Sequence, residues 1–486
     1  MNQKKQLMKN TIIIAIGKLS TQIISYLLLP LYTSQLDPSE YGNYDFICTL
    51  SVFLCPIITL LMEESMFRYL IDADSKVQRK KIITQTIIYT FFGTVLFTII
   101  AALIMGFGTD YTAMYITAII TFVISNILIG LSNALSRGLG KIKLYSVSNF
   151  ILGISTIILN IVFILALNAG AEGLLWANTI ANAFTAIVIL GILKLPKYIG
   201  KIDKPLMKDM IKYSIPLVPN SISWSIINMS DRIILTQMVS SAANGIYAMA
   251  NKFPNIINVL YGYFYTAWKE SAAKIVKEDN KNQYYNSIYH DAKRFLYAVT
   301  ICLIAVMPFA FPIFINEAYD EAYVYIPIVM IATYYSNLSS FYGGIFSAYK
   351  DTKIMGTTTI VAAVINLVID LLLVNSLKIY AACFSTLIAN LIVYFYRKKK
   401  LKKYLKLKEL KWQGPMLFLA IICLAYYAKY IPVIGNNPVL LWTINVISLV
   451  IAVLYSLLNN WKFIKGIINT IKGKFNRKDI KEIRAK

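Results

Sequence analysis

The chain alternates between long apolar segments and short polar connections, and this alternation limits the folds open to it. A helix that crosses a bilayer needs about 20 mostly apolar residues, because its backbone must satisfy its own hydrogen bonds in hydrocarbon. Only 15% of the residues are charged, whereas soluble domains carry about 25%. The sequence therefore predicts an all-α polytopic membrane protein with fourteen transmembrane helices. These are expected at 11–33, 44–65, 82–106, 113–135, 145–167, 173–195, 213–239, 246–268, 294–316, 323–349, 354–377, 379–396, 414–430 and 438–459.

Positive charge is distributed unevenly among the connections. Of the 48 Lys and Arg residues, 43 lie in the N-terminal segment, in alternate connections and in the C-terminal tail, and only Lys378 and Lys429 lie in the other connections. Because cytoplasmic loops are enriched in Lys and Arg, this pattern predicts that both termini are cytoplasmic. A net charge of +24 would suggest nucleic acid in a soluble protein. Here the basic runs fix topology and contact anionic lipid, so no nucleic-acid partner is expected.

A long connection after the sixth predicted helix divides the first twelve helices into two sets of six. The loop LDPSEYGNY (36–44), after the first helix, aligns with VSSAANGIY (239–247), after the seventh. Each places a Gly, and a Tyr two residues later, at the start of the next helix, which indicates duplicated bundles of the kind found in many transporters. The expected divisions are an N-lobe at 1–195 (helices 1–6), a cytoplasmic linker at 196–212, a C-lobe at 213–396 (helices 7–12), a basic cytoplasmic loop at 397–413, helices 13 and 14 at 414–459, and a basic tail at 460–486.

Three cations, Lys18, Arg232 and Lys252, lie inside apolar segments. At 1.5 Å per residue they would lie about 14, 11 and 9 Å from their helix ends, where a charge costs about 2.5 to 3.5 kcal/mol on insertion scales. Few carboxylates lie at these depths, so the pattern predicts a water-filled cavity with a positive lining that attracts an anionic group such as phosphate. The alternative is structural, with Asp231 neutralising Lys18 or Lys252 across the bundle.

The opening GKLSTQIISYLLLPLYTSQLDPSEYGNYDF and the later SIPLVPNSISWSIINMSDRIIL and NGIYAMANKF resemble the polysaccharide-biosynthesis (Wzx-type) flippases of the multidrug/oligosaccharidyl-lipid/polysaccharide (MOP) exporter superfamily. The resemblance covers the whole chain, and a polar first helix running into P-L-Y-T-x-x-L-x-x-x-x-Y-G is typical of that family. It implies a MATE-like fold of two six-helix lobes plus two C-terminal helices, with helices 1, 2, 7 and 8 lining a central cavity.

The same resemblance implies that a polyprenyl-pyrophosphate-linked oligosaccharide moves from the cytoplasmic to the outer leaflet of a bacterial inner membrane, for O-antigen or capsule assembly. It implies membrane lipids, a polysaccharide polymerase and a chain-length regulator as partners. Without a histidine in the membrane segments, an ion-coupling site for Na⁺ or H⁺ would be a carboxylate: Asp231, Asp370 or Glu63. The residues expected to bind the pyrophosphate and sugar are Lys18, Gln22, Trp224, Asn228, Arg232, Lys252 and Asn255.

Other functions of the same architecture remain open. A lipid II flippase would share the cationic cavity, and the sequence hardly distinguishes it from a polysaccharide flippase. A multidrug exporter of the same fold would need an acidic or apolar cavity for cationic substrates. A polymerase or glycosyltransferase would need catalytic residues on a sizeable loop, and the sequence has neither such a loop nor a Walker A motif or metal-ligand cluster. We therefore expect a protein that is not an enzyme and binds no cofactor.

Glu64 is expected to form a structural ion pair with Arg68, one helical turn later.

Overall fold

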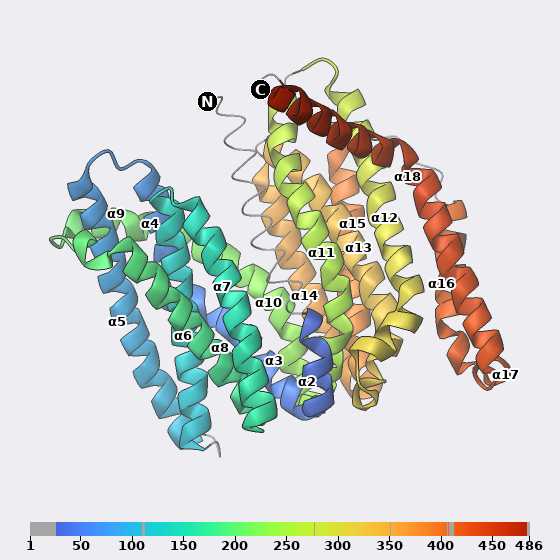
Figure 1. The fold of residues 1–486 in the computed structure, drawn as a ribbon, viewed down its shortest axis with the longest axis horizontal. Coiled ribbons are helices and arrows are strands. Elements are labelled where there is room, and N and C mark those ends of the chain that lie inside the picture. Colours follow the sequence, from blue (N-terminus) through green and yellow to red (C-terminus); the bar gives the residue numbers. More distant parts are fainter. Residues whose placement is uncertain are drawn as a thin grey trace. The chain divides into compact units, whose positions relative to one another are not determined.

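A computed structural model of the chain describes residues 26–108, 112–276, 278–349, 351–405, 407 and 413–483. Every regular element among them is a helix (Figure 1). The elements up to the seventh predicted membrane segment are α2 (Leu29–Gln35), α3 (Pro38–Thr59), α4 (Met62–Ile71), α5 (Lys76–Gly108), α6 (Ala113–Gly138), α7 (Ile142–Ile161), η1 (Val162–Ala166), α8 (Gly170–Leu193), η2 (Leu195–Tyr198), α9 (Lys204–Ser214), η3 (Ile215–Leu217), α10 (Val218–Ile234) and η4 (Leu235–Val239). The later elements are α11 (Ser241–Ile275), α12 (Lys281–Phe314), η5 (Glu317–Tyr319), α13 (Ala322–Ala348), α14 (Thr352–Leu377), α15 (Ile379–Leu401), α16 (Gln413–Tyr426), η6 (Tyr427–Tyr430), α17 (Pro432–Gly435) and α18 (Pro438–Ile483).

Nine helices within the described residues are long and apolar enough to cross a membrane, and Pro415–Tyr430 adds a shorter apolar segment. The protein is therefore a multi-pass membrane protein, although this criterion does not confirm the predicted count of fourteen. Each predicted segment from 44–65 onward coincides with helix, while most of 11–33 lies outside the described residues. Helices α10, α11 and α13 are absent from the nine: α10 has only 17 residues, and polar residues and tyrosines lower the hydropathy of α11 and α13.

The predicted helix at 44–65 is interrupted. Leu60 and Leu61 have positive φ angles of 45° and 55°, and they separate α3 from α4. The hydroxyl of Thr59 accepts a hydrogen bond from the Leu61 amide at 3.1 Å, which satisfies one of the backbone groups freed by the break. A left-handed conformation is costly for a residue with a branched side chain. No glycine marks the position, so the sequence pattern does not reveal it.

The chain folds into two compact units. The first contains Met1–Ala248, Phe314–Asp320 and Asp370–Ile379, and the second contains Met249–Ile313, Glu321–Ile369 and Tyr380–Lys486. Helix α10 and the start of α11, which the sequence assigns to the C-lobe, thus group with the first unit. The division into lobes at 196–212 stays a prediction.

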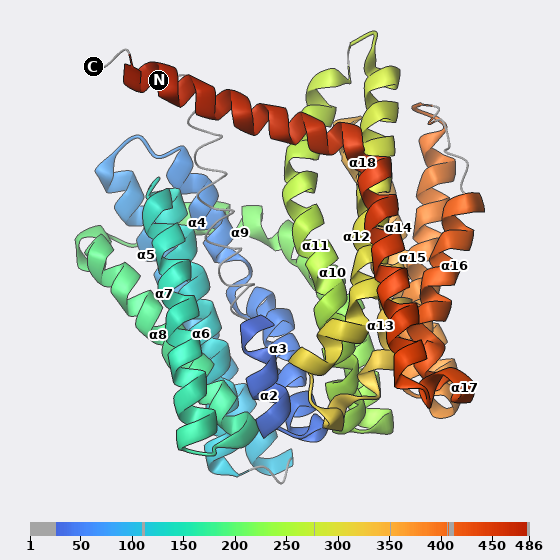
Figure 2. The ribbon, with the colours of Figure 1, turned by 45° about the vertical axis from the view of Figure 1, so that its right-hand side comes forward.

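In the first unit, α5, α6, α7 and α8 lie side by side, and α4 and α9 lie together at one end (Figures 1 and 2). The apolar core at this end joins Met62 and Met66 of α4 to Ile82 of α5 and Met210 of α9. Because α9 contributes Met210, which is fully buried, it belongs to the core although it lies in the predicted linker.

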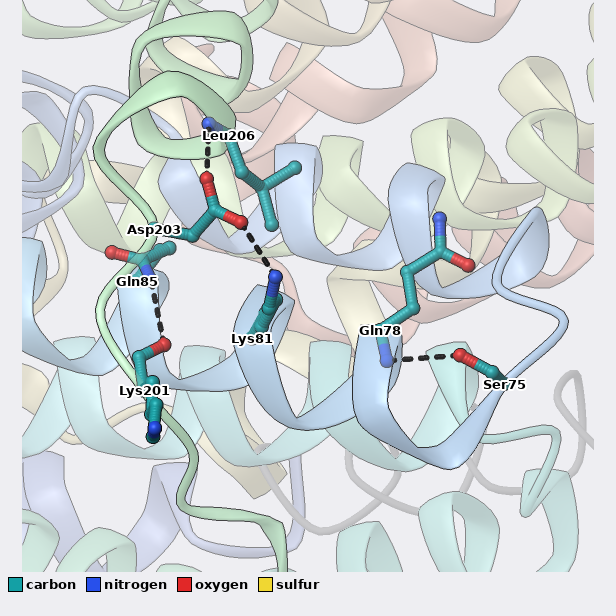
Figure 3. Close-up of polar contacts among 7 residues, drawn as sticks. All are labelled: Ser75, Gln78, Lys81, Gln85, Lys201, Asp203 and Leu206. Carbon is teal, nitrogen blue, oxygen red and sulfur yellow. Dashed lines mark hydrogen bonds and ion pairs between the residues drawn. The ribbon is translucent and has the colours of Figure 1, made fainter.

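The linker segment before α9 is attached to α5 by polar contacts (Figure 3). Asp203 caps α9 by accepting a hydrogen bond from the Leu206 amide at 3.1 Å, and it forms an ion pair with Lys81 at 2.9 Å. The Gln85 side-chain amide donates to the carbonyl oxygen of Lys201 at 3.4 Å. The hydrogen bond to Lys81 lowers the pKa of the Asp203 carboxyl below its ordinary value. The 196–212 connection is therefore a structured part of the first unit.

In the second unit, α11 to α15 lie side by side, and α16 and the first half of α18 lie next to each other (Figures 1 and 2). Helix α13 is buried along most of its length. Trp268 of α11 stacks on Phe341 of α13 with ring centroids 4.3 Å apart and donates to its carbonyl oxygen at 3.1 Å. Tyr323 and Tyr426 stack at 4.1 Å and join α13 to α16. Aromatic contacts thus supply much of the specific packing in this unit.

Candidate functional site

Helices α3 and α11 begin in the same way. Asp37 caps α3 by accepting a hydrogen bond from the Glu40 amide at 2.8 Å, and Ser240 caps α11 by accepting one from the Ala243 amide at 3.1 Å. In both helices the side chain of the N-cap residue accepts from the amide three residues later, as is common at helix starts. The two caps occupy equivalent positions in the loops aligned in the sequence, so the loops share this local structure, while the duplication of the bundles stays a prediction.

The two loops also contact each other through their glycines. A Cβ on Gly42 would overlap the carbonyl oxygen of Ser241, and one on Gly245 would overlap the carbonyl oxygen of Pro38. Pro38 and Ser241 are equivalent positions, each the first residue of its helix, so the contact is reciprocal. The Asn244 side chain adds a hydrogen bond to the carbonyl oxygen of Gly42 at 2.7 Å. Only glycine allows the backbones of the two helix starts to approach this closely.

Arg232 lies on α10, which packs against α3. Its Nε atom donates to an Asp45 carboxylate oxygen at 2.6 Å, and the two side chains are only 18% and 14% exposed. Asp45 is not among the site residues predicted from the sequence, although it is the single charged residue between Glu40 and Glu63. The pair lies one turn beyond the contact of Gly42 with Ser241 and Gly245 and joins α3 to the end of α10. Arg232 therefore has a carboxylate partner inside the first unit.

Asp231, the neighbour of Arg232, has a different partner. The Tyr247 hydroxyl donates to an Asp231 carboxylate oxygen at 2.6 Å, and Asp231 is 3% exposed. The Arg232 guanidinium carbon lies 6.0 Å from the Tyr247 ring centroid, at the outer limit of a cation–π contact. Adjacent residues on a helix point in different directions, which explains why the acid contacts α11 while the base contacts α3. The charged pair in the middle of an apolar segment thus ties both aligned loops to α10.

The other candidate residues are distributed over the chain. Lys18 and Gln22 lie outside the described residues, and the side chains of Trp224 and Asn228 on α10 are not among those described. Lys252 and Asn255 belong to the second unit, the first half-buried and the second exposed. Within the described part of the first unit, Arg232 is therefore the one expected anion-binding residue whose polar partners are defined.

The candidate coupling carboxylates differ in burial. Asp370 on α14 is 1% exposed and, like Asp231, belongs to the first unit, whereas Glu63 on α4 is half-buried.

The prediction that Glu64 forms an ion pair with Arg68 is wrong. Arg68 instead pairs with Asp72 at 2.6 Å, and Glu64 lies 3.6 Å from Arg137. The break before α4 places Glu64 in the first turn of a new helix, where Arg137 of α6 can reach it.

The fold is shared with solved transporters. The lipid II flippase MurJ in an inward closed conformation is 15% identical, with a TM-score of 0.71 over 94% of this chain and all of that chain. An inward-facing multidrug resistance transporter of the MATE family is 15% identical, with a TM-score of 0.65 over 80% of this chain and 98% of that chain. A MOP superfamily transporter from Pyrococcus furiosus is 12% identical, with a TM-score of 0.55 over 83% and 97% of the two chains.

At these identities the likeness shows the fold alone, which is the MATE- and MurJ-like fold of the MOP superfamily. No curated protein matches the chain. The family described as polysaccharide biosynthesis protein matches residues 7–268, which is more than half of the chain and includes both aligned loops, Asp45 and Arg232. The chain belongs to the polysaccharide biosynthesis protein family of membrane transporters.

Proposed function

We propose that the protein is a flippase that moves a polyprenyl-pyrophosphate-linked oligosaccharide from the cytoplasmic to the outer leaflet of a bacterial inner membrane, for O-antigen or capsule assembly. The family membership supports a lipid-linked glycan as substrate. A sugar headgroup and a pyrophosphate cannot cross hydrocarbon unaided, since each unsatisfied polar group costs several kcal/mol. The protein replaces water around these groups while the lipid tail stays in the bilayer.

The observation that carries the proposal is the reciprocal contact of the two aligned loops, beside a largely buried ion pair that joins α3 to α10. The contact between Gly42 and Gly245 and the pair between Arg232 and Asp45 bring related helix starts together in this conformation. In an alternating-access cycle, such a contact closes one side of the transporter and opens when the repeats move apart. The substrate provides the free energy for opening if it competes with Asp45 for Arg232.

Arg232 is suited to this exchange because a guanidinium presents a fork of donors that matches a carboxylate and a phosphate equally well. In the proposed cycle Arg232 leaves Asp45 and binds the pyrophosphate, and Lys18 and Lys252 add positive charge. Gln22, Trp224, Asn228 and Asn255 contact the sugar. Asp231, Asp370 and Glu63 are the proposed carriers of a coupled Na⁺ or H⁺.

The proposed orientation places both termini and the basic connections in the cytoplasm. A cysteine at the exposed position Lys402 should then react only with reagent supplied from the cytoplasmic side, and one at Asn437 only from outside. The reverse accessibility would overturn the orientation and the direction of transport with it.

A lipid II flippase is the second candidate, favoured by the TM-score of 0.71 to MurJ over 94% of this chain. Both substrates carry a polyprenyl pyrophosphate, so the glycan distinguishes them. Purified protein should be reconstituted into vesicles with a fluorescent polyprenyl-pyrophosphate oligosaccharide or with fluorescent lipid II in the inner leaflet. Appearance of the oligosaccharide lipid in the outer leaflet, with little movement of lipid II, supports the proposal. Movement of lipid II alone would establish the second candidate, and movement of neither would refute both.

A further inference from the structure

The second unit contains a buried arginine at the end of α15. Arg397 begins the basic run that the sequence assigns to a cytoplasmic loop, but α15 continues to Leu401 and Arg397 is only 5% exposed. Its Nε atom donates to the Thr358 hydroxyl at 2.9 Å, and Nη1 donates to the Ser339 carbonyl at 3.1 Å. Nη2 lies 3.4 Å from the Met355 carbonyl and 3.5 Å from the Thr359 hydroxyl. The guanidinium thus bonds to two other helices, α13 and α14.

All of these acceptors are neutral. No ion pair among the described residues includes Arg397, whereas Arg68, Arg137 and Arg232 each pair with a carboxylate. Removing a cation from water costs several kcal/mol, and neutral acceptors replace its hydration without cancelling its charge. A structural link between helices would need only neutral donors. Among the described residues the charge is held in place without being neutralised, so it remains available to attract an anion.

One donor of α11, the Tyr265 hydroxyl, lies near this charge, and a second, the Lys269 ammonium, lies near the Tyr265 ring. A Cβ on Gly343 would lie 3.6 Å from Nη1 of Arg397 and 3.7 Å from the Tyr265 hydroxyl, so both groups face the same glycine. The Lys269 ammonium lies 5.2 Å from the centroid of the Tyr265 ring. Tyr265 is half-buried and Lys269 is exposed. Buried charge, hydroxyl and exposed ammonium thus follow one another from the interior to the surface.

These two residues end a polar stripe along α11. Asn255, Asn258, Gly262, Tyr265 and Lys269 are spaced by three or four residues, so they share one face of the helix. Asn255, Asn258, Gly262 and Lys269 are exposed, and Asn258 accepts a hydrogen bond from Asn337 of α13 at 2.9 Å. A polar face on a membrane helix is stable only where it meets water or protein. The stripe leads from Asn255, an expected sugar contact, to the helix end that the sequence predicts to be cytoplasmic.

We propose that Arg397, Tyr265 and Lys269 form a phosphate-binding capture site, which takes the pyrophosphate of the substrate from the cytoplasmic leaflet before the headgroup moves along α11. This inference rests on the proposed function. Lys269 and the Tyr265 hydroxyl contact the phosphate oxygens, and Arg397 attracts them from behind through a medium of low dielectric constant. Phosphate is the chemistry that the site recognises, and the polyprenyl pyrophosphate and an anionic lipid headgroup are its two possible sources.

Acylation of lysines in the full-length protein, quantified by mass spectrometry, tests the site locally. In neutral detergent, inorganic pyrophosphate should slow the modification of Lys269 several-fold. Lys399, an exposed lysine on α15 two residues from Arg397, is the matched control and should react at an unchanged rate. Tyr265→Phe loses a hydrogen bond to the phosphate, and Arg397→Met loses the buried charge, so each should raise the pyrophosphate concentration needed for protection about tenfold.

Equal modification of Lys269 with and without pyrophosphate, in protein with the thermal stability of the wild type, would overturn the inference. Protection only in nanodiscs that contain phosphatidylglycerol would also overturn it, because the site would then bind a lipid headgroup and not the substrate. The two proposals fail separately. Flipping in vesicles without protection of Lys269 refutes the capture site alone, and protection without flipping refutes the proposed function.

Discussion

Arg232 in the first unit and Arg397 in the second are both arginines inside helices, but their surroundings differ. Arg232 lies 2.6 Å from the Asp45 carboxylate. Arg397 is more deeply buried, at 5% exposure, and its partners are carbonyl and hydroxyl oxygens. Breaking a buried ion pair by removing one partner costs about 3 to 5 kcal/mol, whereas a lost neutral hydrogen bond costs about 1 to 3 kcal/mol.

These two arginines show that burial of a cation does not by itself define its role. A paired arginine holds two segments together and is released only when another anion replaces its partner. An arginine among neutral acceptors keeps its attraction for an external anion while its position is fixed. In this protein the first arrangement lies beside the contact of the two aligned loops, and the second lies at the end of a polar helix face.

The largest effect is expected at the glycine contact that accompanies the paired arginine. In Gly42→Ala or Gly245→Ala, the new methyl group would overlap the backbone of the opposite loop, which cannot move as a flexible side chain can. We expect loss of flipping in vesicles together with reduced abundance in the membrane. Gly130→Ala is the control, because nothing lies within 4 Å of a Cβ at that position. Wild-type flipping in both loop variants would show that the contact is not used in transport.

A second prediction compares the partners of the two arginines directly. Asp45→Asn removes the carboxylate that pairs with Arg232, and Thr358→Val removes one neutral acceptor from Arg397 without changing any charge. The unfolding midpoint of the purified protein in detergent should fall further in Asp45→Asn than in Thr358→Val. Loss of the ion pair is expected to lower the free energy of unfolding by about 3 kcal/mol, and loss of the single hydrogen bond by about 1 kcal/mol. The opposite order would mean that Asp45 does not compensate Arg232.

A third prediction concerns the acids near the paired arginine. Asp231→Asn keeps an oxygen that can accept from Tyr247, and Asp370→Asn keeps the size of a buried side chain, so both variants should fold. Neither asparagine can carry a proton or balance a sodium ion. We expect flipping that no longer responds to an imposed proton or sodium gradient, measured in the same vesicles with and without the gradient. A wild-type response in both variants would exclude these two acids as coupling sites.

The smallest effect is expected at the linker, where the ion pair between Lys81 and Asp203 is only partly buried. The pKa of Asp203 is lowered by Lys81, so the contribution of this contact to stability is complete above the ordinary carboxyl pKa of about 3.9 and is lost as the pH falls through the lowered value. The protection factors of the α9 amides, which correct for the intrinsic pH dependence of exchange, should fall slightly below about pH 4. In Asp203→Asn these protection factors should be lower at neutral pH and should not fall further on acidification. A pH dependence shared by wild type and variant would assign it to other groups.

The sequence predicted those parts of the fold that depend on local pattern. Apolar length predicted segments from 44–65 onward that coincide with helix, although α9 was not expected in the linker, and the two aligned Gly-x-Tyr loops share an N-cap hydrogen bond. The break at Leu60 and Leu61 was missed because no glycine accompanies it. The whole-chain resemblance to a polysaccharide flippase agrees with the matched family.

The partners of the charged residues could not be predicted in the same way. Asp45 and Arg232 are 187 residues apart, and their contact depends on how α3 packs against α10. Arg397 looked like one member of a cytoplasmic basic run, because its burial depends on α15 continuing past the apolar segment and on acceptors from α13 and α14. Burial and partner choice are tertiary properties, so a pattern along the chain indicates only that a charge is unusual.

The most direct test asks whether Arg232 binds the substrate or only Asp45. Arg232→Ala alone leaves the Asp45 carboxylate buried without its partner, so it should reduce both abundance and flipping. The double variant Arg232→Ala with Asp45→Ala removes both charges, and neutral replacement of a buried pair is usually tolerated. Flipping of the polyprenyl-pyrophosphate oligosaccharide should be measured per folded protein in vesicles. We predict that the double variant recovers wild-type abundance and still fails to flip the substrate. Recovery of flipping together with abundance would contradict the account, because Arg232 would then serve only as the structural partner of Asp45.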